Sequence, residues 1–319
     1  RRMLSGVAAG RRLLAPAVRV AGACGAGQWR ACSAEAAEVR TVGVLGAGQM
    51  GTGIAQVAAQ VAGADVVLVD VQQQQLDKGM AFMRKLLEKD AAKGRLAAAD
   101  VDGVLARVRT STSMEALAAA DLVVEAATEE EGLKLELFGA LSEVAAPHAV
   151  LATNTSSISI TRIGAATRAP ERVVGMHFMN PVPVMRLVEV IPSLATSAAT
   201  LATTLAAARA MGKTTAQSLD SPGFIANRLL MPYINEAVQA LQEGLGARED
   251  IDSTMKLGCN MPMGPLALAD FIGLDTCLAI MRVLHTQLGD SKYRPAHLLV
   301  KYVDAGWLGK KAGRGFYTY

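Results

Sequence analysis

The amino-acid sequence predicts an α/β protein in which a mostly parallel, doubly wound sheet is followed by an all-helical domain. From Thr41 onward, short β-branched runs alternate with longer segments rich in alanine and leucine, a pattern typical of a parallel sheet covered on both faces by helices. A glycine-rich turn separates the first strand from the first helix, and strand-like runs end before residue 220. We therefore expect a sheet domain over residues 39–220 and a helical domain over residues 221–319.

The individual elements follow from composition and periodicity. Strands are expected at residues 41–45, 65–69, 107–111, 122–125, 150–153, 173–178 and 187–191. Amphipathic helical patterns lie at residues 225–244, 248–257 and 266–288. Ser221 followed by Pro222 suits a helix N-cap and first helical turn, so we expect the second domain to begin there.

Residues 1–38 differ in composition from the rest of the chain. Six arginines precede the first acidic residue, Glu35, in a stretch rich in alanine, serine and glycine. This composition is typical of an organelle transit peptide and predicts a protein of the mitochondrial matrix, with a plastid as the alternative. A disordered or artefactual leader is the other interpretation of the same residues.

Charge and cysteine content exclude several classes of protein. Without the six leader arginines, 26 basic residues stand against 29 acidic ones, and no basic stripe with interleaved aromatics suggests nucleic acid as a partner. No uncharged apolar run is long enough to predict a membrane span. Cys259 and Cys277 are isolated and lack the spacing of metal ligands, so we expect reduced core thiols and no metal site.

The turn after the first strand has the spacing of a dinucleotide-binding loop. Gly46 permits a tight turn, Gly48 lets the backbone approach a pyrophosphate, and Gly51 allows close packing of helix against strand. The helix that starts at Gln49 and Met50 offers free N–H groups to the phosphates. A Rossmann-type cofactor domain is therefore expected.

Asp70 ends the second strand, about twenty residues after the glycine loop, where a carboxylate binds the ribose hydroxyls of NAD. The same carboxylate would repel a 2′-phosphate, and no arginine follows it, since Val71 and Gln72 come next. The sequence therefore favours NAD over NADP.

A histidine and a glutamate form the candidate catalytic pair. His177 ends an apolar run just before an Asn-Pro turn, and Glu189 lies within the next apolar run. A buried glutamate is costly without a partner, and imidazole titrates near neutral pH. We expect Glu189 to orient His177 as a general base. A satisfied core histidine, or an ion pair between Glu189 and Arg186, is the alternative.

With these features assembled, the chain resembles the short-chain L-3-hydroxyacyl-CoA dehydrogenases, which include the 3-hydroxybutyryl-CoA dehydrogenases, from about Thr41 to Tyr319. The resemblance rests on these segments: GAGQMGTGIAQVAA from Gly46, NTSS from Asn154, HFMNPVPVMRLVEVI from His177, DSPGFIANRLL from Asp220, MKLGCNMPMGP from Met255 and GKKAGRGFY from Gly309.

The resemblance implies roles for five residues. His177 matches the catalytic base of the family, and Glu189 matches the carboxylate that orients and supports it. Ser156 matches a serine that contacts substrate and cofactor. Asn180 matches an asparagine near the nicotinamide and the histidine, and Asn227 matches an asparagine that contacts the substrate. Singly, each polar residue could also be an ordinary turn, helix or surface residue.

The resemblance also implies further ligand contacts. Glu129, Lys134 and Lys311 match cofactor contacts. The serine that some members use toward coenzyme A corresponds to Leu86 here, whereas Lys93 matches the accompanying lysine that contacts substrate.

The function that the resemblance implies is the NAD-dependent oxidation of a short-chain (3S)-hydroxyacyl-CoA to a 3-ketoacyl-CoA, in fatty-acid or butanoate metabolism. It also implies a homodimer formed through the helical domain. Two other interpretations remain open: a different β-hydroxyacid dehydrogenase with a lysine base, and a non-catalytic NAD-binding structural relative.

Overall fold

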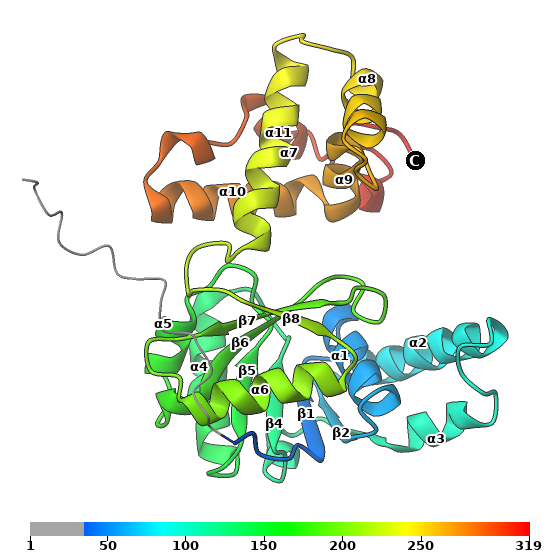
Figure 1. The fold of residues 1–319 in the computed structure, drawn as a ribbon, viewed down its shortest axis with the longest axis vertical. Coiled ribbons are helices and arrows are strands. Elements are labelled where there is room, and N and C mark those ends of the chain that lie inside the picture. Colours follow the sequence, from blue (N-terminus) through cyan, green and yellow to red (C-terminus); the bar gives the residue numbers. More distant parts are fainter. Residues whose placement is uncertain (1–34) are drawn as a thin grey trace, which may run out of the picture. The chain divides into compact units, whose positions relative to one another are not determined.

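The computed structural model describes residues 35–319, so residues 1–34 of the expected leader lie outside the described part of the chain. One eight-stranded sheet, in the order β3-β2-β1-β4-β5-β6-β7-β8, organises residues 41–217 (Figure 1). Its strands are β1 Thr41–Leu45, β2 Asp65–Val69, β3 Val108–Ser111, β4 Leu122–Glu125, β5 Val150–Thr153, β6 Val173–Phe178, β7 Leu187–Pro192 and β8 Thr214–Gln217.

The sheet is parallel except between β6 and β7, which pair antiparallel. Strand order reverses between β1 and β4, and in open α/β sheets ligands bind outside the carboxyl ends of the strands at such a point. Leu45 and Glu125 lie side by side there in the strand register. The glycine-rich turn therefore leaves β1 at the switch point of the sheet.

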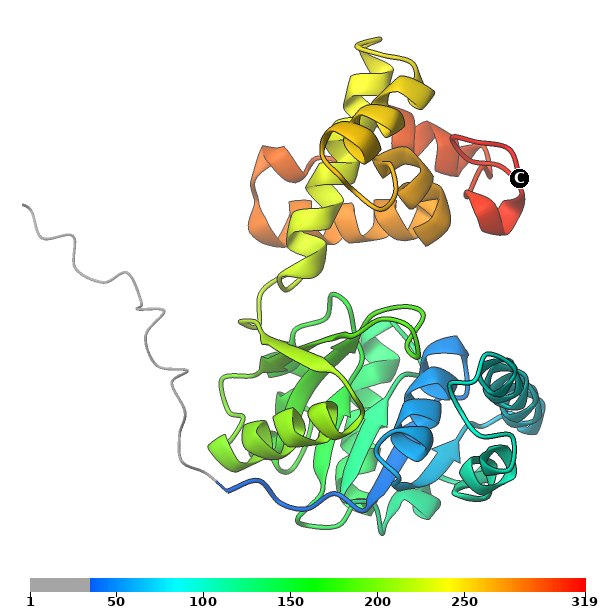
Figure 2. The same ribbon diagram turned by 45° about the vertical axis from the view of Figure 1, so that its right-hand side comes forward.

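Helices cover both faces of the sheet (Figures 1 and 2) because successive strand residues point to opposite sides. Val44 and Leu68 belong to one hydrophobic core, and Leu45 and Val67 belong to the other. The helices are α1 Gln49–Gln60, α2 Gln73–Ala92, α3 Asp100–Ala106 and α6 Ala198–Ala210 over the first core, and α4 Glu131–Val144 and α5 Ile160–Ala165 over the second.

Every regular element after β8 is helical. The longer elements are α7 Ala226–Gln242, α8 Arg248–Ser253, a π-helical turn at Thr254–Gly258, α9 Pro265–Ile272, α10 Leu274–Leu288 and α11 His297–Asp304. Short 3-10 segments lie at Met114–Leu117, Pro170–Arg172, Ser291–Tyr293 and Lys310–Ala312. A separate core joins Met231 of α7, Leu266 of α9, Leu278 of α10 and Leu299 of α11 with Phe316 near the C-terminus.

The seven expected strands are all present, and the eighth was missed. The bounds of β3 and β7 differ from the prediction by one residue each. Strand β8 has the sequence TTAQ and pairs with β7 alone. An edge strand without buried apolar side chains carries no hydrophobic pattern, which explains why composition did not reveal it.

Two helix boundaries differ from the prediction. Gly223 has φ +76° and Phe224 has φ +48°, and both values are incompatible with a right-handed helix. Consequently no helix begins at Ser221 or Pro222, and α7 starts at Ala226. The single helix expected at 266–288 is two helices, because Gly273 has φ +104° and separates α9 from α10.

The two described cysteines behave differently. Cys277 is buried as expected, and burial raises the pKa of its thiol to about 12. Cys259 is exposed, so its assignment to the core was wrong. Within residues 35–319, no helix has the length and apolar character needed to cross a membrane.

Candidate active site

The glycine loop has the backbone geometry that a dinucleotide requires. A Cβ at Gly51 would lie 1.8 Å from the carbonyl oxygen of Gly46, so only glycine allows α1 to pack against the turn. Gly46 itself has φ +105°, which favours glycine. A Cβ at Gly48 would meet no protein atom within 4 Å. Open space thus faces the start of α1, whose free N–H groups favour an anion.

Asp70 closes the loop from the neighbouring strand. Its Oδ2 accepts a hydrogen bond from the backbone N–H of Ala47 at 2.8 Å, and its Oδ1 accepts one from the N–H of Gln72 at 3.0 Å. Each carboxylate oxygen can accept more than one hydrogen bond, so Asp70 keeps acceptor capacity for ribose hydroxyls. The residues of the loop and Asp70 therefore fit a dinucleotide.

His177 and Glu189 face each other because β6 and β7 are antiparallel and pair these two residues directly. The Nδ1 atom of His177 lies 2.7 Å from Oε2 of Glu189. Glu189 is 1 % exposed and His177 is 8 % exposed. The predicted pairing is therefore present, and Arg186, the alternative partner, is exposed.

The second oxygen of Glu189 contacts the start of the helical half. Oε1 accepts hydrogen bonds from the backbone N–H groups of Ile225 at 3.0 Å and Ala226 at 2.9 Å. Burial raises the pKa of Glu189, but the hydrogen bond from His177 and these two N–H groups outweigh burial, so the pKa lies below its usual value. Glu189 is consequently an ionised, fully bonded carboxylate at neutral pH.

Asn180 follows the histidine strand and reaches the cofactor loop. Its Oδ1 accepts a hydrogen bond from Nε2 of Gln49, the first residue of α1, at 3.0 Å. On the same loop, the side chain of Val182 packs closely against Gly53 of α1. A Cβ added to Gly53 would lie only 2.8 Å from the Cβ of Val182. These two contacts bring the segment after His177 against the helix that starts at the glycine loop.

Lys213 anchors this segment, although no sequence pattern singled it out. Its ammonium is buried and donates to the carbonyl oxygens of Val182 at 2.5 Å and Met185 at 2.9 Å. Burial lowers the pKa of Lys213. Because the acceptors are backbone carbonyls, no side-chain pattern could have revealed this contact.

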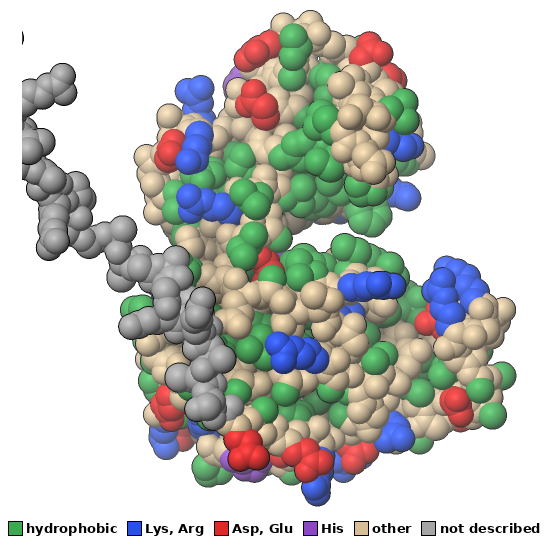
Figure 3. All heavy atoms as spheres, viewed as in Figure 1, with side chains coloured by type: hydrophobic (Ala, Val, Ile, Leu, Met, Phe, Trp, Pro, Cys, Tyr) green, Lys and Arg blue, Asp and Glu red, His purple; other side chains and the backbone are tan. Residues whose placement is uncertain are grey.

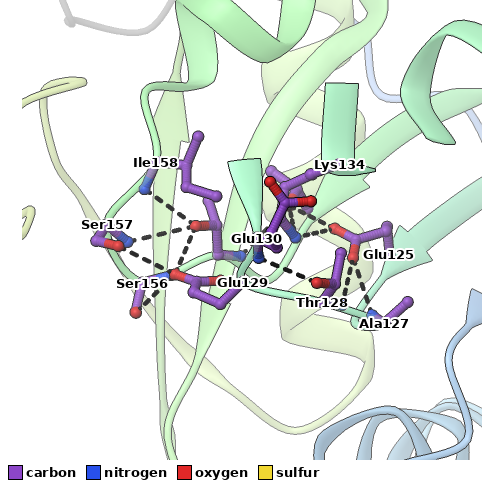
Figure 4. Close-up of polar contacts among 11 residues, drawn as sticks. Glu125, Ala127, Thr128, Glu129, Glu130, Lys134, Ser156, Ser157 and Ile158 are labelled. Carbon is purple, nitrogen blue, oxygen red and sulfur yellow. Dashed lines mark hydrogen bonds and ion pairs between the residues drawn. The ribbon is translucent and has the colours of Figure 1, made fainter. Parts of the chain in front are cut away.

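Ser156 lies in the turn after β5, and it contacts the carboxylate of Glu129, which lies in the turn after β4 (Figure 4). Oε1 of Glu129 accepts hydrogen bonds from the N–H and the hydroxyl of Ser156, each at 2.8 Å. It also accepts from the hydroxyls of Thr155 at 2.8 Å and Ser157 at 3.2 Å. Two of the predicted site residues are thus brought together, although the sequence assigned them separate contacts.

Lys134 is buried below the same turn. Its ammonium pairs with Oε2 of Glu125, the last residue of β4, and lies 3.4 Å from the hydroxyl of Thr153. Glu125 also accepts the N–H groups of Ala127 and Thr128. The described contacts of Lys134 support the turn that carries Glu129, so a direct contact of Lys134 with the cofactor stays a prediction.

Asn227 lies in the first turn of α7 and is 9 % exposed, not facing solvent. Its Nδ2 lies 3.4 Å from the backbone oxygen of Ser156, which it approaches as a donor. The hydrogen bonds from Ile225 and Ala226 to Glu189 hold the start of the same helix. The structure therefore places Asn227 beside Ser156 and directly after the two residues that donate to Glu189.

The remaining predicted ligand residues lie apart from this group. Lys311 pairs with Asp275 at the start of α10, at 2.7 Å. Lys93 caps the end of α2 and is exposed, and Leu86 is half-buried on the same helix. No described contact connects these three residues with His177 or the glycine loop, and the ligand roles of Lys311 and Lys93 stay predictions.

Comparison with known proteins adds family information to this geometry. The family model described as 3-hydroxyacyl-CoA dehydrogenase, NAD binding domain, matches residues 41–221, and its C-terminal domain matches residues 223–319. The chain is 55 % identical to a probable 3-hydroxybutyryl-CoA dehydrogenase of Bacillus subtilis over 88 % of this chain and 98 % of that protein. It is 54 % identical to a 3-hydroxybutyryl-CoA dehydrogenase of Bradyrhizobium diazoefficiens, over 89 % and 97 %.

A solved structure gives the same result. The (S)-3-hydroxybutyryl-CoA dehydrogenase of Ralstonia eutropha has a TM-score of 0.86 and 50 % sequence identity, over 88 % of this chain and 99 % of that one. The matched domains identify this chain as an oxidoreductase with NAD as its cofactor. The predicted fold class, an NAD-binding Rossmann sheet with a helical C-terminal domain, is confirmed.

These relatives also correct the predicted location. The three proteins come from bacteria, which have neither mitochondria nor plastids, so the prediction of a mitochondrial or plastid protein was wrong. Composition alone carried that prediction. An arginine-rich, acid-free stretch meets the compositional criterion of a transit peptide whether or not any organelle imports it.

Proposed function

The chain belongs to the 3-hydroxyacyl-CoA dehydrogenase family, and we propose that it oxidises short-chain (3S)-hydroxyacyl-CoA to 3-ketoacyl-CoA, with 3-hydroxybutyryl-CoA as the preferred substrate. The observation that carries the proposal is the buried hydrogen bond between His177 and Glu189. The segment that follows β6 is tied to the dinucleotide loop by the hydrogen bond from Gln49 to Asn180. The proposal assigns the reaction to fatty-acid or butanoate metabolism.

His177 is the proposed general base. An ionised carboxylate can only accept hydrogen bonds, so Glu189 requires the proton of His177 on Nδ1. Nε2 is then left with its lone pair and can accept the proton of the substrate hydroxyl. As His177 becomes an imidazolium, the charge of Glu189 stabilises it at short distance in a buried site.

NAD accepts the hydride from C3 when it is bound, and this chain supplies position and charge. The glycine loop and the start of α1 would hold the pyrophosphate, and Asp70 would hold the adenosine ribose. Asn180 would lie beside the nicotinamide end. Removal of the hydroxyl proton during hydride loss avoids a protonated ketone, which is why a base is needed at this place.

Ser156 and Asn227 are the proposed contacts for the substrate and the nicotinamide end of the cofactor. They come from opposite halves of the chain and lie within one hydrogen bond of each other. Two fixed polar groups at these positions would hold the substrate with its donor carbon toward the nicotinamide end of the cofactor. We propose that Lys93, Lys311 and Glu129 contribute to ligand binding from outside this pair.

We further propose a domain boundary after Asp220 and a homodimer formed through the helical domain. Large apolar side chains are exposed in that domain (Figure 3). They are Leu229, Leu245, Leu257, Met261, Met263 and Phe271. Exposed apolar residues at this density favour a protein interface. Light scattering of the purified protein tests the proposal, and a monomer at micromolar concentration contradicts it.

The test of the function is a nicotinamide absorbance assay with acetoacetyl-CoA and longer 3-ketoacyl-CoAs, using NADH and NADPH. We expect the highest kcat/KM with acetoacetyl-CoA and NADH. His177→Gln should lower kcat by ~10²–10⁴-fold, as expected for loss of a general base, with little change in NAD binding. Absence of turnover with every 3-ketoacyl-CoA contradicts the proposed reaction, and an unchanged kcat in the variant contradicts the role of His177.

A further inference from the structure

The ring of Phe224 packs against the imidazole of His177. The ring centroids lie 5.7 Å apart at an interplanar angle of 60°, an edge-to-face arrangement that aromatic pairs prefer over face-to-face stacking. Phe224 is buried and belongs to the second core of the sheet, together with Ile160 and Ile191. The imidazole therefore meets Glu189 through Nδ1 and a buried aromatic side chain through its ring.

Phe224 occupies this place in an unusual backbone conformation. Its φ is +48° and that of Gly223 is +76°, whereas a bulky residue rarely adopts a positive φ. Such conformations persist only where the surrounding structure enforces them, and they cluster at functional sites. The N–H of Phe224 donates to the carbonyl oxygen of Ser221 at 2.9 Å and closes the turn. With the chain turned in this way, the ring enters the sheet core and α7 begins two residues later.

The residues that follow Phe224 contact the other member of the catalytic pair. The N–H groups of Ile225 and Ala226 donate to Oε1 of Glu189 at 3.0 and 2.9 Å. Three consecutive residues thus contact His177 or Glu189. The χ2 torsion of a histidine has broad energy minima, so one hydrogen bond at Nδ1 still allows the ring to tilt. A second contact on the ring removes this freedom.

We propose that Phe224 is a positioning residue for His177: its ring fixes the tilt of the imidazole and thereby the direction in which Nε2 faces the substrate hydroxyl. The proposal rests on the proposed function, because this direction matters only if His177 removes a proton. Proton transfer depends on the angle of the hydrogen bond as well as on its length. A catalytic group must be held within about 10–20° of its productive orientation.

The first measurement compares Phe224→Leu with Phe138→Leu in the assay with acetoacetyl-CoA and NADH. Phe138 of α4 is buried in the same core, so each variant exchanges one ring for an aliphatic side chain in that core. We expect Phe224→Leu to lower kcat by about tenfold, the equivalent of about 1.4 kcal/mol, while the KM for NADH stays within about twofold. Phe138→Leu should lower the melting temperature and leave kcat unchanged.

The second measurement observes the imidazole directly, by NMR of the protein with isotope-labelled histidine. The chain has four histidines, and the signals absent from His177→Gln belong to His177. Because an aromatic ring shifts the proton signals of a group packed against it, Phe224→Leu should move the ring-proton signals of His177. Its nitrogen signals should still report the proton on Nδ1, which shows that the contact with Glu189 is kept. Phe138→Leu should move neither set.

Four outcomes overturn the proposal. A kcat of Phe224→Leu within about twofold of wild type shows that the ring does not position the base. Unchanged proton signals of His177 in that variant show that the two rings are not in contact in solution. A move of the ring proton to Nε2 assigns the loss to the contact with Glu189. An equal loss of kcat in Phe138→Leu assigns it to the core as a whole.

The failure of this role is distinguishable from the failure of the proposed function. Wild-type turnover is measured first, and its absence defeats the proposed function and this role with it. The outcomes above, obtained with an active enzyme, defeat only the role of Phe224. If Phe224→Leu does not fold, Phe224→Met replaces it and is compared with Phe138→Met, because methionine is unbranched and adapts its shape to a core site.

Discussion

Replacement of Glu189 by glutamine tests the arrangement around His177, because the carboxylate of Glu189 accepts three hydrogen bonds there. Oε2 accepts from His177 at 2.7 Å, and Oε1 accepts from the N–H groups of Ile225 and Ala226. Glutamine has the same shape but only one oxygen. If that oxygen keeps the two N–H groups, the NH₂ group faces Nδ1 of His177.

The consequence for catalysis is a change of tautomer. An NH₂ group donates, so Nδ1 of His177 must accept and the ring proton moves to Nε2. Nε2 can then no longer accept the proton of an alcohol. We expect kcat to fall by ~10²–10⁴-fold, the range for loss of a general base, while the KM for NAD changes little because the glycine loop is untouched.

The consequence for stability depends on pH. Hydrogen bonds to a charged group contribute about 1.5–3 kcal/mol each before the cost of burying the charge, and we expect a net loss of about 1–3 kcal/mol in the free energy of unfolding. The folded state lowers the pKa of Glu189 from its usual 4.5. Its contribution is therefore fully present above pH 4.5 and is lost as the pH falls through the lower, folded-state pKa.

Urea unfolding at pH 7 and below pH 4.5, together with kcat from nicotinamide absorbance, checks both consequences. The difference in stability between wild type and Glu189→Gln should be largest at pH 7 and should shrink at the lower pH. Glu136→Gln, at an exposed position, serves as the control and should leave kcat and stability unchanged. A Glu189→Gln variant that retains the wild-type kcat would refute the orienting role of this carboxylate.

Three further predictions concern other parts of the structure. Asp70→Ala should lower the ratio of kcat/KM for NAD to that for NADP by about tenfold, since the carboxylate that accepts ribose hydroxyls and repels a phosphate is lost; steady-state kinetics with both coenzymes measure this, and an unchanged ratio contradicts it. Lys213→Met should lower the free energy of unfolding by about 1–3 kcal/mol, because the buried carbonyl of Val182 and the part-buried carbonyl of Met185 lose their donor; urea unfolding measures the loss, and Lys301→Met at an exposed position should show none. Cys277, whose thiol pKa is raised to about 12, should resist a thiol reagent at pH 8 in the folded protein once the other cysteines are replaced by serine; rapid labelling without denaturant would show that the helical core opens.

The sheet could be predicted because its information is local. A buried parallel strand is a run of β-branched residues on both faces, and each of the seven strands expected from such runs is present. Thr214–Gln217 has no such run, since it lies at the edge beside β7. The amphipathic pattern from residue 225 located α7 to within one residue, but the helix start suggested by Ser221 and Pro222 is wrong, because Gly223 and Phe224 have positive φ and Phe224 is buried in the second sheet core.

The part of the candidate site that could be predicted is the pair of side chains that two neighbouring strands place opposite each other. His177 and Glu189 are opposite each other once their strands pair antiparallel, and the Asn-Pro turn between them indicated a return of the chain. Lys213 and the hydroxyls around Glu129 were not predictable in this way. Their partners are backbone carbonyls and residues of a different turn, and contacts between segments distant in sequence leave no spacing pattern in one chain.

Glu189 connects His177, the proposed base, to the helix that carries Asn227, the proposed substrate contact. Its Oε1 holds the N–H groups of Ile225 and Ala226, and the next residue along the chain is Asn227. Negative charge at a helix start is stabilised by the N–H groups of the first turn. The carboxylate that fixes the tautomer of His177 thus also fixes the start of the helix that carries Asn227 toward Ser156. A displacement of α7 would therefore disturb both the hydrogen bonds to Glu189, which orients the proposed base, and the contact between Asn227 and Ser156.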